Sequence, residues 1–331
     1  MSLRRRQHVL SIAAALGGLL LFAWAARRAG ISEILDGIQR VGWGLLPLFA
    51  LAGLRFAARA EAWRLCAPRG RRMRHAQAFA AFLAGDAVGN ATPLGWFASE
   101  PTKVFLTRHH FATADSVSSL AIDNLLYISS TAVVIAGAGV IVMATMNLPL
   151  VWREWSSVVL AASIASVIAL VWILRGGAGL AGAFPSAWQT RLTELRGSFT
   201  AFSPGPVQVA QALLFDFGFH GLAVVEAYLS LKWLLGSASP TLREAFLFEA
   251  LNRVITVAFK FVPFRVGVDE ASSGALAPLL GMDPVVGVSL AVVRKVRNLF
   301  WAGIGMAVIA AHPAQAAPAM DPRGNAPARR T

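Results

Sequence analysis

A short pattern occurs twice in this chain and constrains its fold more than any other feature. In each copy a proline is followed seven residues later by a glutamate: Pro93 and Glu100 in the first half, Pro263 and Glu270 in the second. A long apolar stretch follows each copy. A duplicated, proline-broken element in an apolar chain is typical of the core of a membrane transporter.

The composition places the chain in a membrane. Of its 331 residues, 56% are hydrophobic and only 14% are charged, whereas soluble domains carry about 25% charged residues. The net charge of +13 lies mainly in short arginine runs beside apolar stretches, which is typical of loops that orient a membrane protein and not of a nucleic-acid interface. Cys66 is the only cysteine, so neither an intrachain disulfide nor a thiolate zinc site is expected.

These features predict an all-α, polytopic transmembrane helix bundle. A span needs about 20 mainly apolar residues, and about eight stretches qualify: 9–26, 42–60, 76–92, 115–145, 153–174, 207–235, 243–262 and 284–311. The segments 93–110 and 264–281 are too short and polar to cross, so we expect two broken or re-entrant segments related by an internal repeat. Such backbone is tolerated at membrane depth only where protein or water surrounds it. Whether the repeats are parallel or inverted stays open.

The predicted organisation has two membrane halves joined by a linker. Residues 1–174 form the first half, with the first repeat at 76–145, and residues 207–312 form the second half, with the second repeat at 243–311. The linker, 175–206, contains an amphipathic helix stripe, and the Pro- and Arg-rich tail, 313–331, is expected to be disordered. The arginine-rich segment from Arg55 to Arg74 is interpreted as a cytoplasmic loop, which gives a cytoplasmic N-terminus in an inner-membrane protein.

Polar residues gather around the first break. Asp86 and Asn90 stand four apart on one helical face before Pro93, which stops the helix because proline lacks the amide proton. Glu100 and Lys103 follow at the i,i+3 spacing that allows an ion pair on a helix. The second break has the same character: Pro263 ends a helix and Gly267 loosens the chain before Glu270.

Further charges lie inside the long apolar stretches. Each costs roughly 2.5–3.5 kcal/mol at the bilayer centre on the insertion scale, so together they must face one another or water. The predicted transport or substrate-binding residues are Asp86, Asn90, Glu100, Lys103, Asp123, Arg253, Glu270 and Arg294. For a single pair such as Glu249 and Arg253, fastening of helices is an equally open interpretation.

Other patterns allow weaker conclusions. Asp216 and His220, four apart in 207–235, are either a proton relay or a satisfied polar contact between helices. His109 and His110 have no third ligand at a recognisable spacing, so no metal is expected. The chain contains no Gly-rich phosphate loop, no H-E-x-x-H and no G-x-S-x-G motif, which favours a protein that is not an enzyme and needs no cofactor.

The pattern Asn90-x-Thr92-Pro93…Glu100-x-x-Lys103, together with Pro263, Gly267 and Glu270, resembles the lysylphosphatidylglycerol synthase transmembrane region family. These are flippase-like membrane proteins that include hopanoid-cluster members. The family's second block reads Pro-Gly-Gly-x-Gly-x-x-Glu, and here Phe264 and Arg265 stand at its first two glycine positions. The resemblance covers about residues 5–312. It implies the lipid-moving half alone, without the aminoacyl-transferase domain of bifunctional relatives.

Three functions follow as hypotheses. The first is a flippase or lipid-binding transporter, in which a polar intramembrane cleft takes a membrane lipid with an anionic or isoprenoid-type head group. The second is a membrane enzyme, or an accessory subunit beside a lipid-modifying enzyme, in which a carboxylate would serve as general base. The third is a scaffold whose polar residues only fasten helices.

Overall fold

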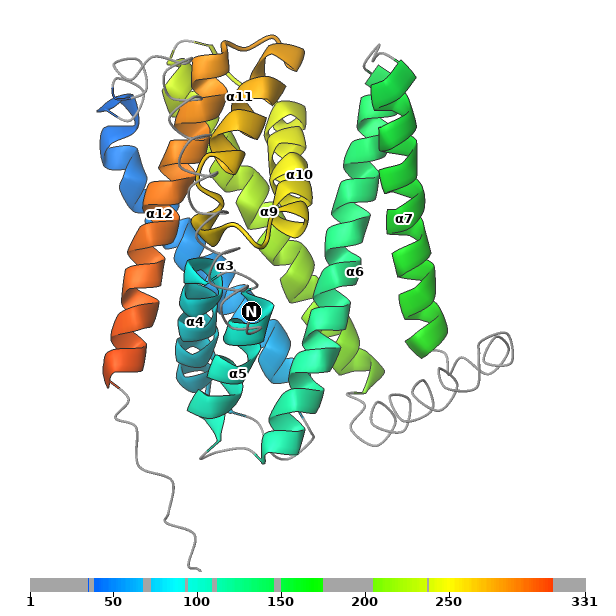
Figure 1. Cartoon of the computed structure of the whole chain (residues 1–331), viewed down its shortest axis with the longest axis vertical. Coiled ribbons are helices and arrows are strands. Elements are labelled where there is room, and N and C mark those ends of the chain that lie inside the picture. The colour runs from blue at the N-terminus through cyan, green and yellow to red at the C-terminus, as the bar shows by residue number, and fades with distance from the viewer. Residues whose placement is uncertain are drawn as a thin grey trace, which may run out of the picture.

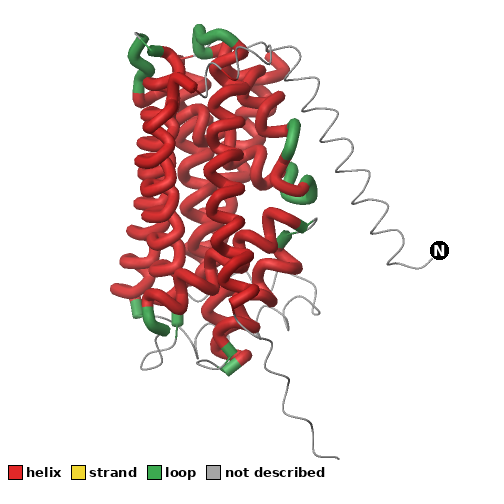
Figure 2. Tube along the Cα trace, turned by 90° about the vertical axis from the view of Figure 1, so that its left-hand side faces the viewer, coloured by secondary structure: helices red, strands yellow, loops and turns green. Residues whose placement is uncertain are grey.

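The computed structural model describes Leu35 and residues 39–67, 73–92, 95–108, 112–145, 150–174, 205–236 and 238–311. Every regular element in these ranges is a helix, which confirms the all-α bundle (Figures 1 and 2). Outside the described residues lie the predicted span 9–26, nearly all of the linker 175–206, and the tail 313–331. The breaking residue Pro93 and the pair His109 and His110 also lie outside them.

The helices fall into long rods and two short hairpins. The long rods are α3 (Leu45–Leu65, after the 3-10 turn Gly42–Gly44), α6 (Thr113–Thr145), α7 (Leu150–Leu174), α9 (Pro206–Leu235) and α12 (Pro284–Ala311). The first hairpin consists of α4 (His75–Ala91) and α5 (Trp96–Thr107). The second consists of α10 (Leu242–Ala258), the 3-10 turn η3 (Pro263–Arg265) and α11 (Val268–Leu279).

Each hairpin fills only half the height of the bundle. In Figure 1, α4 and α5 occupy the lower half and α10 and α11 the upper half, and the ends of these helices that face the other hairpin lie near mid-height. The 17 residues of α4 and of α10 give helices about 26 Å long, against about 50 Å for the 33 residues of α6. The helices within the stretches 76–92 and 243–262 therefore end near mid-height of the bundle. Pro263 contributes to the second turn because it cannot donate a helical hydrogen bond.

The two halves run in opposite directions. The first has the order α3, hairpin, α6, and the second has the order α9, hairpin, α12. The first hairpin enters from the lower end of the bundle in Figure 1 and the second from the upper end. The helices α3 and α9 pack against each other, and η3 contacts α4. This arrangement favours an inverted relationship between the repeats, which the sequence left open.

Three helical stretches in the described part of the chain are long and apolar enough to cross a membrane: Gln39–Leu65, Asp115–Thr145 and Pro206–Leu235. The 28-residue α12 is long enough but carries Arg294, Lys295 and Arg297 within one turn. The total of about eight spans stays a prediction.

Close backbone contacts hold the hairpins in place. A Cβ on Gly95 would lie 2.1 Å from the carbonyl oxygen of Gly89, so α4 and α5 approach as closely as they do because both positions lack a side chain. A Cβ on Gly305 would lie 2.5 Å from the carbonyl oxygen of Leu83, so α12 packs directly on the backbone of α4. The first hairpin is thereby fixed against the last helix.

Candidate functional site

Four arginines and two glutamates from four helices meet inside the bundle. Glu226 on α9 accepts hydrogen bonds from Arg55 on α3, at 2.6 Å, and from Arg297 on α12. Glu249 on α10 accepts from Arg253 one turn further on and from Arg294 on α12, at 3.2 Å. We call this set the central arginine cluster: Arg55, Glu226, Glu249, Arg253, Arg294 and Arg297.

The central arginine cluster carries more positive than negative charge. All six residues are at most 8% exposed. Four guanidinium groups face two carboxylates at hydrogen-bonding distance. Asp86 on α4 interacts electrostatically with Arg55 and Arg297, and including it still leaves one positive charge in excess.

Two donors of the cluster are unused. Arg55 Nε and Arg253 Nε are buried and make no hydrogen bond to any described residue. Leaving a buried donor unpaired costs about 1–3 kcal/mol, and more for a charged group. The cluster therefore has both the charge and the donors to take up an anion.

A second charged group lies one helical turn along α3. Arg59 donates to both carboxylate oxygens of Asp123 on α6, at 3.1 and 2.8 Å, and to Asp216 on α9. We call these three residues the Arg59 triad. Its net charge has the opposite sign to that of the central arginine cluster, because two carboxylates share one guanidinium group.

The positions of Arg55 and Arg59 correct an expectation from the sequence. The predicted cytoplasmic loop from Arg55 to Arg74 overlapped the predicted span 42–60. The helix α3 continues to Leu65 and buries both side chains, at 8% and 3% exposed. No helix breaker occurs in this stretch, and acidic partners on α6 and α9 compensate the two charges. The loop therefore begins after Leu65.

Tyr127 on α6 connects the two groups. The guanidinium carbon of Arg59 lies 4.1 Å from the centroid of the Tyr127 ring, and Arg253 donates to the Tyr127 hydroxyl at 3.2 Å. The ring also stacks on His220, with centroids 5.8 Å apart. Tyr127 thus contacts one arginine of each group.

The predicted acidic residues of the hairpins are each paired with a lysine. Glu100 accepts from Lys103 at 2.9 Å, which is the i,i+3 pair expected from their spacing. Glu270 is fully buried. It accepts from Lys295 on α12, at 2.5 Å, and from the N-cap amide of Gly267, at 2.7 Å, as the N3 glutamate of a capping box does at the start of α11.

Asp86 and Asn90 also meet as their spacing suggests, since the Asn90 amide donates to the Asp86 carboxylate at 2.9 Å. Asp86 interacts electrostatically with Lys103 on α5 and with Lys260 near the turn of the second hairpin. The turns of the two hairpins therefore share one electrostatic environment at mid-height.

The turn of the second hairpin has an unusual backbone. Phe264 and Arg265 have φ angles of +49° and +50°, a region that non-glycine residues rarely adopt. In the family that this sequence resembles, glycine occupies both of these positions. Arg265 is held there by Asp269, at 3.1 Å, and its carbonyl accepts from Lys295, at 3.3 Å.

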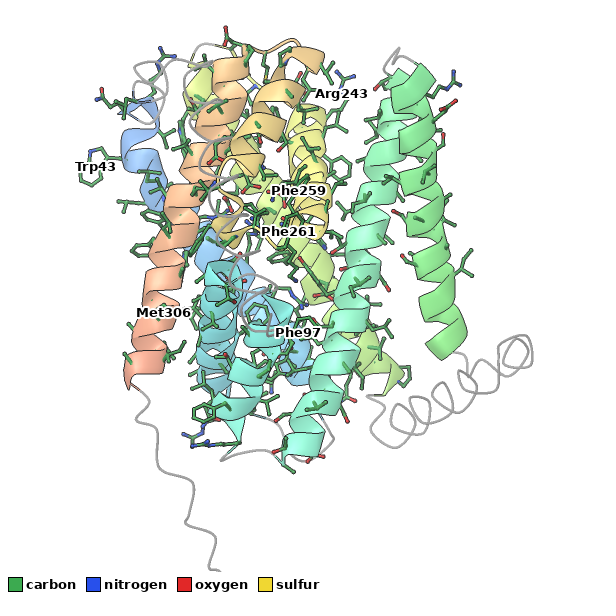
Figure 3. All side chains as sticks on the ribbon, in the orientation of Figure 1. Trp43, Phe97, Arg243, Phe259, Phe261 and Met306 are labelled. Atoms are coloured by element: carbon green, nitrogen blue, oxygen red, sulfur yellow. The ribbon has the colours of Figure 1, made fainter. Side chains whose placement is uncertain are left out.

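Exposed aromatic side chains surround the hairpin turns. Phe97, Phe259 and Phe261 are 82%, 36% and 46% exposed, and Figure 3 places all three near mid-height, between the two hairpins. The described residues contain no group of three or more metal-binding side chains.

The structure brings the predicted residues into three places. Arg253 and Arg294 share Glu249 in the central arginine cluster, and Asp123 lies in the Arg59 triad. The remaining predicted side chains, Asp86, Asn90, Glu100, Lys103 and Glu270, lie in the two hairpins. Arg55, Arg59, Glu226 and Arg297 were not among the predicted site residues. Two features of the sequence could have indicated them. One is the pair of arginines four residues apart inside the apolar stretch 42–60, and the other is the single glutamate inside 207–235.

The comparisons with known proteins agree with the resemblance. No curated protein and no solved structure shows detectable similarity to the chain. Residues 9–305 match the family described as the lysylphosphatidylglycerol synthase TM region, which is most of the chain. Together with the helical bundle and its internal charges, this match identifies the chain as a member of the lysylphosphatidylglycerol synthase transmembrane region family.

Proposed function

We propose that the protein moves a lipid with a phosphate-bearing head group across the membrane, and that the central arginine cluster binds the phosphate. The observation that carries this proposal is the excess of arginine over glutamate at the meeting point of α3, α9, α10 and α12. An unpaired charge is too costly to keep in hydrocarbon. A bound anion would neutralise it.

The chemistry of the cluster suits a phosphate. Guanidinium groups bind phosphate oxygens through two parallel hydrogen bonds, and such charge-assisted bonds are roughly twice as strong as neutral ones. The unused donors Arg55 Nε and Arg253 Nε are available without breaking an existing pair. Glu226 and Glu249 hold the guanidinium groups in place when no lipid is bound.

The opposed hairpins suggest how the head group reaches the cluster. We infer that both are re-entrant, one from each side of the membrane, so that movement of either hairpin would open a path from one surface to mid-membrane. Inverted repeats commonly provide such alternating access around a fixed central site. The exposed ring of Phe97 and those of Phe259 and Phe261 would contact the acyl chains while the head group moves.

The proposed function also implies a location, a partner and a driving force. The protein would act in the inner membrane, with its N-terminus in the cytoplasm, without catalytic chemistry and without a cofactor. A lipid-modifying enzyme would supply the lipid or use it on the other side. A gradient or the lipid's own concentration difference would drive the movement.

A reconstitution experiment tests the proposal. The full chain is placed in vesicles with a fluorescent phospholipid, and movement is followed by the loss of fluorescence when a membrane-impermeant quencher is added. We expect Arg253→Lys to slow the movement strongly, because lysine keeps the charge but loses the planar donor set. Arg243→Lys, an exposed position at the start of α10 (Figure 3), is the matched control and should behave as the unchanged protein.

The outcomes separate the three hypotheses. If the reconstituted protein moves no phospholipid and no polyprenyl phosphate, the proposal fails. Chemical conversion of an added lipid by the purified protein would instead establish the enzyme hypothesis. Equal movement in Arg253→Lys and in the unchanged protein would exclude the central arginine cluster as the binding site.

A further inference from the structure

The Arg59 triad contains one more carboxylate than guanidinium groups. Asp123 and Asp216 both contact Arg59, and both are 0% exposed. Two carboxylates and one guanidinium leave one negative charge in a buried place. Two closely placed carboxylates rarely stay ionised together, since each raises the energy of the other's charge.

The hydrogen bonds show which carboxylate differs. Asp123 uses both oxygens on Arg59, whereas Asp216 uses only Oδ1. Asp216 Oδ2 is buried and accepts no hydrogen bond from any described residue. A buried carboxylate oxygen without a donor is the position at which a proton would be held.

The surroundings supply no other compensation for Asp216. Its electrostatic interactions are with Arg59 and Asp123. His220 lies one turn along α9, with Nε2 3.3 Å from the Ser130 hydroxyl and with Nδ1 buried and unpaired. The other titratable or charged groups that face the triad, on α5, α6, α10 and the end of α3, are Glu100, Lys103, Tyr127, Arg253 and Cys66.

A monovalent metal ion fits this place poorly. Three of the four carboxylate oxygens of the triad already accept from Arg59, and the described residues contain no group of three or more His, Cys, Asp or Glu side chains that could hold a metal ion. One free oxygen and a neighbouring imidazole are too few for such an ion. A single proton needs no more than this.

We propose that Asp216 is a proton-binding site and that its proton uptake and release drive the lipid movement. The coupling rests on the proposed function, whereas the proton site does not. A proton from water on one side binds the Asp216 carboxylate and is later released to water on the other side, so no other reactant is needed. Asp123 stays ionised as the permanent partner of Arg59.

Tyr127 is the positioning residue that couples the two sites. It lies against Arg59 of the triad and accepts from Arg253 of the central arginine cluster. In addition, α3 carries both Arg55 and Arg59, and α9 carries both Asp216 and Glu226. A shift of Arg59 on protonation of Asp216 would therefore reach the phosphate-binding arginines through one ring and two shared helices.

The first experiment detects the proton directly. Infrared difference spectra of the full chain in lipid, recorded while pH is changed, distinguish a protonated carboxyl group from a carboxylate. We expect a carboxyl band that titrates with pH, is absent in Asp216→Asn, and persists in Glu154→Gln, an exposed position on α7. If Asp216→Asn does not fold, Asp216→Glu serves instead, because the band then shifts in frequency.

Two results would overturn the proton site. One is a spectrum without a protonated carboxyl band assignable to Asp216 at any pH at which the protein stays folded. The other is a band that disappears on adding Na⁺ at constant pH, which would show a metal-ion site. Neither result depends on lipid movement, so the proton site can fail while the proposed function holds.

The second experiment tests the coupling in the vesicle assay with a pH gradient imposed across the membrane. In the unchanged protein the gradient should accelerate lipid movement in one direction. Asp216→Asn should lose this gradient-dependent part. Tyr127→Phe should lose it as well but keep the titrating infrared band, since the ring remains and only the hydrogen bond to Arg253 is removed. Equal gradient dependence in all three proteins would refute the coupling.

Discussion

Neutralising Glu249 should destabilise the bundle more than neutralising Glu226, the other acidic residue of the central arginine cluster. The Glu249 side chain is 2% exposed, accepts from Arg253 and Arg294, and lies 4.0 Å from a guanidinium nitrogen of Arg55. Glu249→Gln preserves its shape but removes its charge. Three guanidinium groups then lose their shared counter-charge in a buried place.

The magnitude follows from the burial of these groups. Breaking a buried ion pair by removing one partner costs about 3–5 kcal/mol, because the remaining charge is left uncompensated. We expect the variant to lose stability in this range, measured as the free energy of unfolding in mixed micelles with increasing denaturing detergent. Glu154→Gln, at an exposed position on α7, is the control and should stay within about 0.5 kcal/mol of the unchanged protein.

A small effect would refute this reasoning. If Glu249→Gln unfolds within the range of the control, the central arginine cluster is either hydrated or compensated by another group, and the argument for anion binding loses its basis. A large loss that added phosphate reverses would strengthen the argument, since a bound anion replaces the missing charge.

Exchanging the charges of Glu249 and Arg253 distinguishes a cluster from an isolated pair. If the pair only fastened one helical turn, Glu249→Arg combined with Arg253→Glu would restore stability and function. The structure predicts that it does not, because the new arginine would face Arg294 and Arg55, and the new glutamate would face the Tyr127 hydroxyl. Full recovery in the unfolding and vesicle assays would support the scaffold hypothesis instead.

Three further replacements test the packing of the hairpins, each by the same unfolding measurement. Gly305→Ala should lower the free energy of unfolding by about 1–3 kcal/mol, because the added Cβ would overlap the backbone of α4. Gly303→Ala, at a position with open space, is the control and should leave stability unchanged. Equal effects of the two replacements would contradict the close contact. Gly267→Ala should lower the free energy of unfolding by about 1–2 kcal/mol, because Gly267 has a φ angle of +82°, which residues with a side chain rarely adopt. An unchanged stability would show that this turn can adopt another backbone conformation. Lys295→Met should cost about 3–5 kcal/mol by leaving the buried Glu270 carboxylate unpaired, and a stable variant would show that Glu270 is neutral.

Local spacing predicted the local contacts well. The ion pair of Glu100 with Lys103, the hydrogen bond of Asn90 to Asp86, and the pair of Glu249 with Arg253 all follow from the geometry of a single helix. The helical class and the two breaks were predictable for the same reason, because hydropathy and proline act within a few residues.

Contacts between distant segments were not predictable from one sequence. Glu226 and Arg297 are 71 residues apart, and Arg59 and Asp216 are 157 apart. No periodicity relates such positions. The assignment of Arg55 and Arg59 to a loop was wrong because the charge rule counts arginines near helix ends and does not see that acids on other helices can compensate them. Opposed hairpins likewise depend on whether a segment crosses, which hydropathy alone does not decide.

The three basic residues within one turn of α12 affect how this helix inserts into the membrane. Alone in hydrocarbon, Arg294, Lys295 and Arg297 would each add roughly 2.5–3.5 kcal/mol to the insertion energy of this helix. Their partners Glu226, Glu249 and Glu270 precede them in the chain. If α12 crosses the bilayer, we therefore expect it to insert stably only after the earlier segments that carry these acids, so that its insertion and its packing against them are coupled.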